Sequence, residues 1–333
     1  MNPATTSNKF LEFKLQPWGV LSAAGSSICL ASLTGFIGQY WWLLDLTSHF
    51  RVQYFLLLFG IAVGFGTVRK YQQAAVFAIF SLINLFVIIP GYIYPNVGKQ
   101  SARQHFRALL LNVNTNNENY DLVEKLIEKN DPDIIVLEEV DSAWIRSLSG
   151  IQKDYPYSII RARGDNFGIA LFSRSPLKTA DIAYIGKADV PSIVTRMQVG
   201  TSTLTILATH PLPPVGAGYA HLRDDQLSSL SETIREIEKP VIVLGDLNTT
   251  PWSFHFRDLL KESGLSDSCR GYGIQGTWPS FFFPLRIPID HCLHSSEVTI
   301  LNRKIGSDVG SDHLPLIVDF TLGNLTKVAN FGR

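Results

Sequence analysis

The stretch VIVLGDLNTTP, Val241–Pro251, decides how the rest of the chain is interpreted. Its four apolar residues run directly into Gly245, and an apolar run of this length before a glycine predicts a buried strand that ends in a turn. Asp246 and Asn248 then stand two residues apart, where the strand leaves the core. Asp and Asn are common turn residues whose side chains bond the local backbone, so this stretch alone fits a turn as well as a functional site.

Composition divides the chain near residue 100. The sequence of 333 residues has a formal net charge of zero, but residues 1–104 contain seven Lys/Arg and only two acidic residues. The remainder, 105–333, holds 22 of the 29 basic and 27 of the 29 acidic residues, which is a net charge of −5. This length leaves room for one large domain and an additional segment. The three cysteines are an odd number, which argues against a disulfide framework.

Three long apolar stretches predict a membrane anchor in residues 1–104. A helix needs about 20 apolar residues to cross a bilayer, and almost uncharged stretches cover residues 18–44, 52–68 and 74–94. Buried helices of a soluble domain fit poorly, because these stretches are apolar on all faces. The stretches also lack paired charges of the kind that line a transport path. Aromatic residues of the interfacial type lie near their ends, namely Trp41, Trp42, Tyr54, Tyr92 and Tyr94.

Three crossings place the N-terminus and the C-terminal domain on opposite sides of the membrane. The side with more Lys and Arg close to the spans is expected to be the cytoplasmic one. Here the two sides are nearly balanced, and the difference favours an N-terminus inside and a C-terminal domain outside by a narrow margin. The N-terminal side carries Lys9, Lys14, Arg69 and Lys70; the other side carries Arg51, Lys99 and Arg103, and a fourth, Arg107, only if the start of the C-terminal domain is counted.

Residues 105–322 are expected to form an α/β domain, followed by a short tail, 323–333. Helical periodicity appears within 119–130, 222–238 and 253–263. Many strands with a few interspersed helices indicate a layered α/β architecture. The runs typical of strands are RALLLNV (107–113), IIVLEEV (134–140), YSIIRA (157–162), GIALFS (168–173), SIVTRMQV (192–199), TLTILATH (203–210), VIVLGD (241–246), IDHCLHS (289–295) and LPLIVDF (314–320).

Polar residues gather at the ends of these expected strands. Functional sites form where strand ends meet, on loops that a rigid core holds in place. Six such clusters in one domain are difficult to assign to turns alone. They are Asn112 with Asn114, Glu138 with Glu139, Thr209 with His210, Asp246 with Asn248, Asp290, and Asp312 with His313.

These blocks, in this order, resemble the endonuclease/exonuclease/phosphatase superfamily of metal-dependent phosphoesterases, over about residues 107–320. The superfamily includes nucleases, neutral sphingomyelinases and inositol-polyphosphate phosphatases. The resemblance implies a four-layer α/β/β/α sandwich of two mixed sheets. Three apolar helices followed by TWPSFFFPLRIPIDH are also similar to a bacterial membrane-anchored branch, which implies a bacterial cell membrane. The matching blocks are LLLNVN, DPDIIVLEEV (with Glu138 where Gln is usual), GIALFSRSPL, ATHPL, GDLN, IDHCLHS and SDHLPL.

By this resemblance, Asn112, Glu139 and Asp312 are the expected metal-side residues. Hard oxygen ligands suit Mg²⁺, which one or two carboxylates hold while it keeps several waters. We therefore expect Mg²⁺ as the cofactor, with Mn²⁺ as an alternative. Asn114 competes with Asn112 for the role of the site amide, and the sequence leaves that choice open.

The resemblance also implies five catalytic residues. Asp246 would orient or deprotonate the attacking water, while His210 and Asn248 would bind the phosphate. Asp290 and His313 resemble an acid–imidazole pair, in which the carboxylate fixes the ring tautomer so that the other ring nitrogen can contact a phosphoryl oxygen.

Some neighbouring polar residues are expected to have structural roles. Glu138 and His291 each sit beside a candidate site residue, and strand alternation predicts that they point to the opposite face. Arg223 lies in a helical segment, and we expect it on the helix surface. The remaining histidines, His49 among them, have no motif support.

The sequence therefore predicts a membrane-anchored, metal-dependent phosphoesterase that cleaves a phosphodiester or phosphomonoester. Nucleic-acid proteins usually carry a basic face, and the domain's net charge of −5 favours a lipid headgroup or small phosphate ester instead. A DNA or RNA nuclease stays open as an alternative. So does a membrane-tethered binding module that kept the fold without activity.

Overall fold

Two mixed β-sheets of six strands each form the C-terminal domain of the computed structural model, which describes residues 16–93, 105–199 and 202–323. The β1–β2 and β7–β8 pairs are parallel, and the other paired strands run antiparallel. The first sheet has the order β11 (Val298–Ile305), β12 (Leu316–Leu322), β1 (Phe106–Asn112), β2 (Ile134–Glu138), β4 (Ile169–Ser173) and β3 (Tyr157–Arg161). The second has the order β5 (Asp181–Tyr184), β6 (Pro191–Val199), β7 (Ser202–Thr209), β8 (Val241–Asp246), β10 (Asp290–His294) and β9 (Ser266–Asp267).

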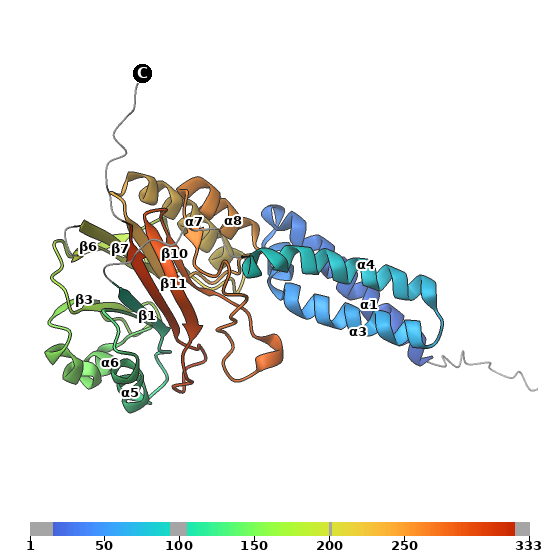
Figure 1. Ribbon diagram of the computed structural model, residues 1–333, viewed down its shortest axis with the longest axis horizontal. Coiled ribbons are helices and arrows are strands. Elements are labelled where there is room, and N and C mark those ends of the chain that lie inside the picture. Colours follow the sequence, from blue (N-terminus) through green and yellow to red (C-terminus); the bar gives the residue numbers. More distant parts are fainter. Residues whose placement is uncertain (1–15, 94–104, 200–201, 324–333) are drawn as a thin grey trace, which may run out of the picture.

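Helices cover the outer face of each sheet, so the expected four-layer α/β/β/α sandwich is confirmed (Figure 1). α5 (Tyr120–Asn130) and α6 (Ser142–Ser147), with the short η4 (Leu148–Lys153), pack on the first sheet. α7 (Ala217–Glu236) and α8 (Phe254–Ser263) pack on the second. A third apolar layer lies between the sheets and contains Leu110, Val136, Ile206 and Leu244.

The three N-terminal helices form a bundle that extends away from the sandwich (Figure 1). They are α1 (Pro17–Thr34), α3 (Arg51–Thr67) and α4 (Tyr71–Ile88), the last followed by η3 (Ile89–Tyr92). Three helical segments are long and apolar enough to cross a membrane: Pro17–Tyr40, Trp42–Thr67 and Tyr71–Tyr92. Tyr94, the last residue of the third expected span, and the tail beyond residue 323 lie outside the described residues.

The first expected span, 18–44, is interrupted in the structure. The chain adopts an extended conformation at Trp41, with φ −161° and ψ 133°, between η1 (Gly35–Tyr40) and α2 (Trp42–Leu46). Together with η2 (Thr47–Phe50), these short helices form a segment, Gly35–Phe50, that we call the junction. The junction lies at the end of the bundle that meets the sandwich (Figure 1).

Buried polar contacts fasten the junction to the second sheet's helices and loops. The Asp45 carboxylate pairs with the Arg223 guanidinium of α7 at 2.9 Å, and both side chains are buried. Asp45 also accepts a hydrogen bond from Ser253 at 2.7 Å, and His49 Nδ1 lies 3.0 Å from Thr250 Oγ1. The expectation that Arg223 lies on the helix surface is therefore wrong, because its side chain is buried against Asp45 of the junction.

Candidate active site

Strand alternation delivers five polar side chains to one end of the space between the sheets. Successive side chains of a strand point to opposite faces, so every second residue shares a face. The inward-facing apolar residues of the relevant strands are Leu110, Val136, Ala208, Leu244 and Cys292. Two positions away from them, in the same order, stand Asn112, Glu138, His210, Asp246 and Asp290. The apolar core between the sheets therefore ends in a polar cluster.

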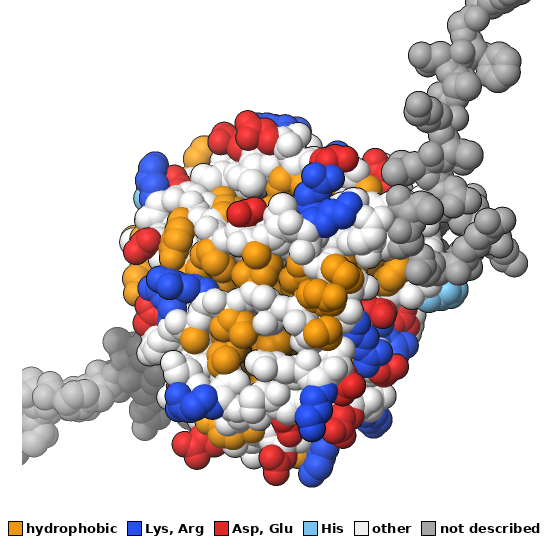
Figure 2. Space-filling model, turned by 90° about the vertical axis from the view of Figure 1, so that its left-hand side faces the viewer, with side chains coloured by type: hydrophobic (Ala, Val, Ile, Leu, Met, Phe, Trp, Pro, Cys, Tyr) orange, Lys and Arg blue, Asp and Glu red, His pale blue; other side chains and the backbone are white. Residues whose placement is uncertain are grey.

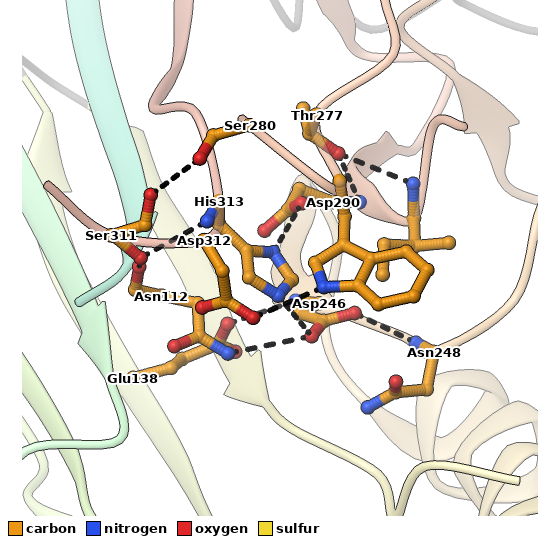
Figure 3. Close-up of polar contacts among 12 residues, drawn as sticks. Asn112, Glu138, Asp246, Asn248, Thr277, Ser280, Asp290, Ser311, Asp312 and His313 are labelled. Carbon is orange, nitrogen blue, oxygen red and sulfur yellow. Dashed lines mark hydrogen bonds and ion pairs between the residues drawn. The ribbon is translucent and has the colours of Figure 1, made fainter. Parts of the chain in front are cut away.

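Asp246, Asp290 and His313 form the centre of this cluster (Figure 3). Asp246 and Asp290 are direct partners across the β8–β10 ladder. His313 Nδ1 lies 3.0 Å from Asp290 Oδ2, and its Nε2 lies 3.6 Å from Asp246 Oδ2. Burial lowers the pKa of His313, but the charges of Asp290 and Asp246 outweigh that effect and raise it to about 10. The ring is therefore protonated at neutral pH, with one nitrogen directed at each carboxylate.

His210 occupies the opposite side of Asp246. Its Nδ1 donates to the Asp246 carbonyl oxygen at 3.1 Å, and its Nε2 lies 3.6 Å from Glu139 Oε1. Burial lowers the pKa of this imidazole as well, but Glu139, Glu138 and Asp246 raise it to about 10. Two buried imidazolium groups therefore flank Asp246, each able to donate to the oxygens of an anionic substrate.

Glu139 enters the site because β2 ends one residue earlier. Its backbone has a φ of +60°, a left-handed conformation that is uncommon for a residue other than glycine. Asn112 Nδ2 donates to Glu139 Oε1 at 2.9 Å and lies 3.5 Å from Asp246 Oδ2. Burial raises the pKa of Glu139, but His210 and Asn112 hold it below its ordinary value. Asn112 therefore orients the carboxylates of Glu139 and Asp246.

Glu138 also faces the site, which corrects the expectation that it points to the opposite face. It is fully buried, and its Oε2 accepts the backbone N–H of Asp246 at 2.9 Å, so it joins the ends of β2 and β8 across the two sheets. Burial raises the pKa of Glu138 to about 8. This contact fits the expected structural role, because the Glu138 carboxylate holds the backbone of Asp246 in position.

A second amide–carboxylate pair lies on the other rim. Asn114 Nδ2 donates to Asp312 Oδ1 at 2.8 Å, and Trp278 Nε1 donates to Asp312 Oδ2 at 3.1 Å. Asn112 thus contacts the carboxylates of Glu139 and Asp246, whereas Asn114 contacts that of Asp312. Asn248, two residues after Asp246, has a left-handed conformation, φ +49°, and its backbone N–H donates to Asp246 Oδ1 at 2.9 Å.

The polar residues of the site that line a cleft of about 640 Å³ are Glu139, His210, Asp246, Asn248, Asp312 and His313. One wall carries the polar side chains described above, whereas the other is largely apolar. The apolar wall includes three junction residues, Leu46, His49 and Phe50. Further apolar residues come from the loop before α7 and from the segment before β10, namely Pro213, Pro214, Val215, Trp278, Ile287 and Ile289. The N-terminal region therefore forms part of the cleft.

The polar wall fits a hard divalent cation by the chemistry of its donors. Glu139 and Asp312 offer carboxylates to the cleft, and the amides of Asn112 and Asn114 stand beside them. In the described part of the chain, no three His, Cys, Asp or Glu side chains come together as a metal-binding group. Mg²⁺ needs only one or two protein carboxylates, because water completes its coordination.

Two contributors to this site were not predicted from the sequence. Trp278 contacts Asp312 through its indole N–H, and the junction supplies part of the wall, but neither had been assigned a role in the site. For Trp278 the position between two matching blocks was a usable signal. For the junction the only signal in the sequence was a charged residue within an apolar stretch, namely Asp45, with Arg51 directly after the junction. A charged side chain in a membrane-spanning segment is energetically unfavourable, so such residues often have a specific partner.

A comparison with protein-family models agrees with this geometry. Residues 109–313 match the model of the endonuclease/exonuclease/phosphatase family, which is more than half of the chain. The chain belongs to this family. The strand ends that carry Asn112, Glu139, Asp246 and Asp290 all lie inside the matched range, and His313 is its last residue.

Among curated proteins, the chain is similar to the inositol phosphosphingolipids phospholipase C of Saccharomyces cerevisiae. The two are 28% identical over 168 residues, which cover 42% of this chain and 35% of the yeast protein. The chain thus spans about a third of the length of this relative.

Two solved structures show the same fold at low identity. The endonuclease/exonuclease/phosphatase of Bacteroides vulgatus has a TM-score of 0.56 and 20% identity, over 66% of this chain and 100% of that one. D. rerio TDP2, complexed with a single-strand DNA product, has a TM-score of 0.56 and 16% identity, over 66% and 99%. Likeness at this level concerns the fold alone.

Proposed function

We propose that this protein is a membrane-anchored, divalent-metal-dependent phosphoesterase that hydrolyses the phosphate ester of a lipid headgroup. The observation that carries the proposal is the two-sided cleft. One wall holds imidazoles and carboxylates, and the other is apolar and includes residues of the N-terminal helices. A phosphate ester with an attached hydrocarbon chain matches both walls.

The polar wall supplies the groups that hydrolysis needs. Burial raises the pKa of Asp246 to about 6; the charge of Asp290 adds to this effect, and the charge of His313 opposes it. Asp246 is therefore ionised at neutral pH and can accept a proton from water. The water oxygen forms a bond to phosphorus as the bond to the leaving oxygen breaks, and that oxygen takes up a proton. Protonated His210 and His313 donate to the phosphoryl oxygens, where negative charge develops.

Mg²⁺ is the proposed cofactor, held by Glu139 and Asp312, with Asn112 or Asn114 beside it. Bound there, a divalent cation neutralises charge on the phosphoryl oxygens and stabilises the leaving oxygen. Asn248 completes the substrate contacts in this proposal. Asp290 holds the His313 imidazolium in the orientation that directs Nε2 away from Asp290, and its charge keeps the ring protonated.

Two lines of support favour a lipid substrate over nucleic acid. The yeast relative carries the name of a phospholipase that acts on phosphosphingolipids. A DNA-binding face neutralises many phosphates and is therefore strongly basic. Residues 105–333 carry a net charge of −5, and Figure 2 shows acidic and basic side chains interspersed on the face turned away from the bundle.

A substrate panel on the full-length protein tests this proposal. It should contain sphingomyelin, other phospholipids, inositol phosphates, RNA, and single- and double-stranded DNA, each with Mg²⁺, Mn²⁺ or EDTA. We expect metal-dependent release of a phosphorylated headgroup, abolished by Asp246→Ala. Cleavage of DNA with lipids untouched would replace the proposal by the nuclease alternative. Equal signal from both proteins under every metal would favour a non-catalytic binding module.

We also propose that the three N-terminal helices integrate into a bacterial cell membrane with the C-terminal domain outside. Trypsin added to intact cells should then degrade the C-terminal domain. Protection in intact cells, with digestion only after lysis, would place the domain inside.

A further inference from the structure

An exposed aromatic loop lies beside the N-terminal bundle. Between Trp278 and Ile287 the chain reads PSFFFPLR and includes η5 (Phe283–Leu285). Its apolar side chains are strongly exposed, with fractions of 79% for Phe281, 46% for Phe282, 77% for Phe283 and 47% for Leu285. Contiguous exposed apolar side chains of this kind mark an interaction surface.

The base of this loop is fixed, so its aromatic tip is held outward. Trp278 and Ile287 exchange two backbone hydrogen bonds, of 3.1 and 2.6 Å. The Arg286 side chain turns back and donates to the Pro279 carbonyl at 3.2 Å, and its guanidinium lies 5.5 Å from the centre of the Phe283 ring. Arg286, the only charged residue of the loop, therefore binds to the base of the loop itself.

Contacts with α3 set the position of the loop along the bundle. Gln53 Nε2, in the first turn of α3, lies 3.2 Å from both the Pro284 and the Arg286 carbonyl oxygens. Leu56 and Leu57, 57% and 53% exposed, follow three and four residues later. Three residues of α-helix span about 4.5 Å. The loop therefore lies at the level where the exposed apolar surface of α3 begins.

The loop is also connected to the polar wall of the cleft. Trp278, which precedes it, donates to the Asp312 carboxylate at 3.1 Å. Ser280, within it, donates its backbone N–H to the Asp312 carbonyl at 2.7 Å. Any surface that binds the loop is therefore held next to the cleft.

We infer that Phe281–Leu285 docks on the lipid bilayer and holds the mouth of the cleft against the membrane surface. A bilayer is the occupant because the loop continues the apolar surface of helices long enough to cross one. Aromatic side chains suit the interface between headgroups and acyl chains. The inference rests on the proposed membrane anchoring and extends it, since the substrate then enters from the lipid side.

Spin labelling of the full-length protein tests the docking without any need for activity. A nitroxide is attached to Phe283→Cys in a Cys269→Ser background, because the other two cysteines, Cys29 and Cys292, are buried. The protein is reconstituted into vesicles of phosphatidylcholine and phosphatidylglycerol. Collision of the label with oxygen, which concentrates in lipid, is compared with collision with a water-soluble nickel chelate. Tyr184→Cys, at an exposed aromatic position on the edge strand β5, is the matched control.

We expect the label at position 283 to collide with oxygen and to be shielded from nickel, and the label at position 184 to behave in the opposite way. Equal access of nickel to both labels would overturn the inference. A chain that alkaline carbonate washes off the vesicles would overturn the anchor and the inference together. Absence of hydrolysis, by contrast, would count against the proposed function and leave the labelling result intact.

A kinetic comparison adds a second readout. The variant Phe281→Ser/Phe283→Ser should cleave a lipid substrate in vesicles roughly tenfold more slowly, since each lost aromatic removes apolar contact with the bilayer. Its hydrolysis of a small water-soluble phosphodiester, bis-p-nitrophenyl phosphate, should be unchanged. Equal losses on both substrates would show that the loop acts within the protein and would contradict docking on lipid.

Discussion

Removal of the charge on Asp45 should destabilise the protein and impair its site at the same time. Asp45 and Arg223 form an ion pair of 2.9 Å, with 0% and 1% of their side chains exposed. Arg223 also donates to the carbonyl oxygen of Asn248 at 3.0 Å, so the pair supports the loop that follows β8. The substitution Asp45→Asn keeps the size and the acceptor for Ser253 but removes the charge.

The expected loss of stability depends on the partners that Arg223 keeps when the charge of Asp45 is removed. Removal of one partner from a buried ion pair costs about 3–5 kcal/mol. Arg223 retains Asp224, at 2.7 Å, as a second carboxylate. We therefore expect a loss below that range, about 2–3 kcal/mol. For a domain of this size the loss corresponds to a fall in Tm of roughly 5–10 °C.

Thermal unfolding in detergent micelles, followed by intrinsic fluorescence, measures this effect. Glu262→Gln is the matched control, because its ion pairs with Lys261 and Arg235 lie on the surface of α8, and we expect no change in Tm. Metal-dependent hydrolysis should fall for Asp45→Asn and not for the control. An unchanged Tm for Asp45→Asn would refute the reasoning that the junction is fastened by this pair.

A double variant separates stability from activity. Apolar residues of similar volume can replace a buried ion pair with little loss of stability, so Asp45→Leu/Arg223→Met should regain much of the lost Tm. Its activity should stay low, because the hydrogen bond to the Asn248 carbonyl is absent. Full recovery of both quantities would show that Arg223 has no influence on the site.

Three further predictions concern the site and acid stability. Glu139→Gln should reduce metal-dependent hydrolysis by on the order of a hundredfold or more, because it removes a proposed Mg²⁺ ligand; equal rates for variant and wild type would contradict that role. Asp290→Asn should lower kcat by roughly a thousandfold or more with little change in KM, because His313 loses the carboxylate that orients its ring and keeps it protonated; a rise in KM alone would instead indicate a binding role. Burial raises the pKa of Asp267, but His291 and Arg303 hold it below its ordinary value, so its stabilisation is present at neutral pH and is lost as the pH falls below about 4. In a series of Tm measurements from pH 7 to pH 3, Asp267→Asn should be less stable than wild type at pH 7 and should lose less on acidification.

Hydrophobic runs in the sequence predicted the central strands of both sheets but missed most of the strands at the sheet edges. The nine expected strand runs coincide with strands of the two sheets. β5 and β11 were missed because they lie at the sheet edges, where exposed polar residues interrupt the apolar pattern. β9 is only two residues long. Periodicity reports burial, and of the four edge strands only β3, which contains Ile159 and Ile160, produced a recognisable pattern.

The site shows a different limit, which Glu138 and Glu139 illustrate. Alternation predicts that neighbouring strand residues face opposite ways, yet both carboxylates reach the site. β2 ends at Glu138, and the left-handed backbone of Glu139 turns its side chain back towards the cleft. A conformation of this kind costs about 1–3 kcal/mol and persists only where surrounding contacts impose it. Sequence spacing cannot show where such a turn replaces regular strand geometry.

The charges gathered in the cleft explain why a divalent cation suits this site. Glu139, Asp246, Asp290 and Asp312 bring four carboxylates, while Glu138, with a pKa of about 8, is largely neutral at pH 7. His210 and His313, both with a pKa of about 10, contribute two positive charges. The four negative and two positive groups leave a net charge of about −2, which repels an anionic phosphate ester. In the proposed mechanism one divalent cation would cancel this charge and so allow His210 and His313 to bind the phosphate.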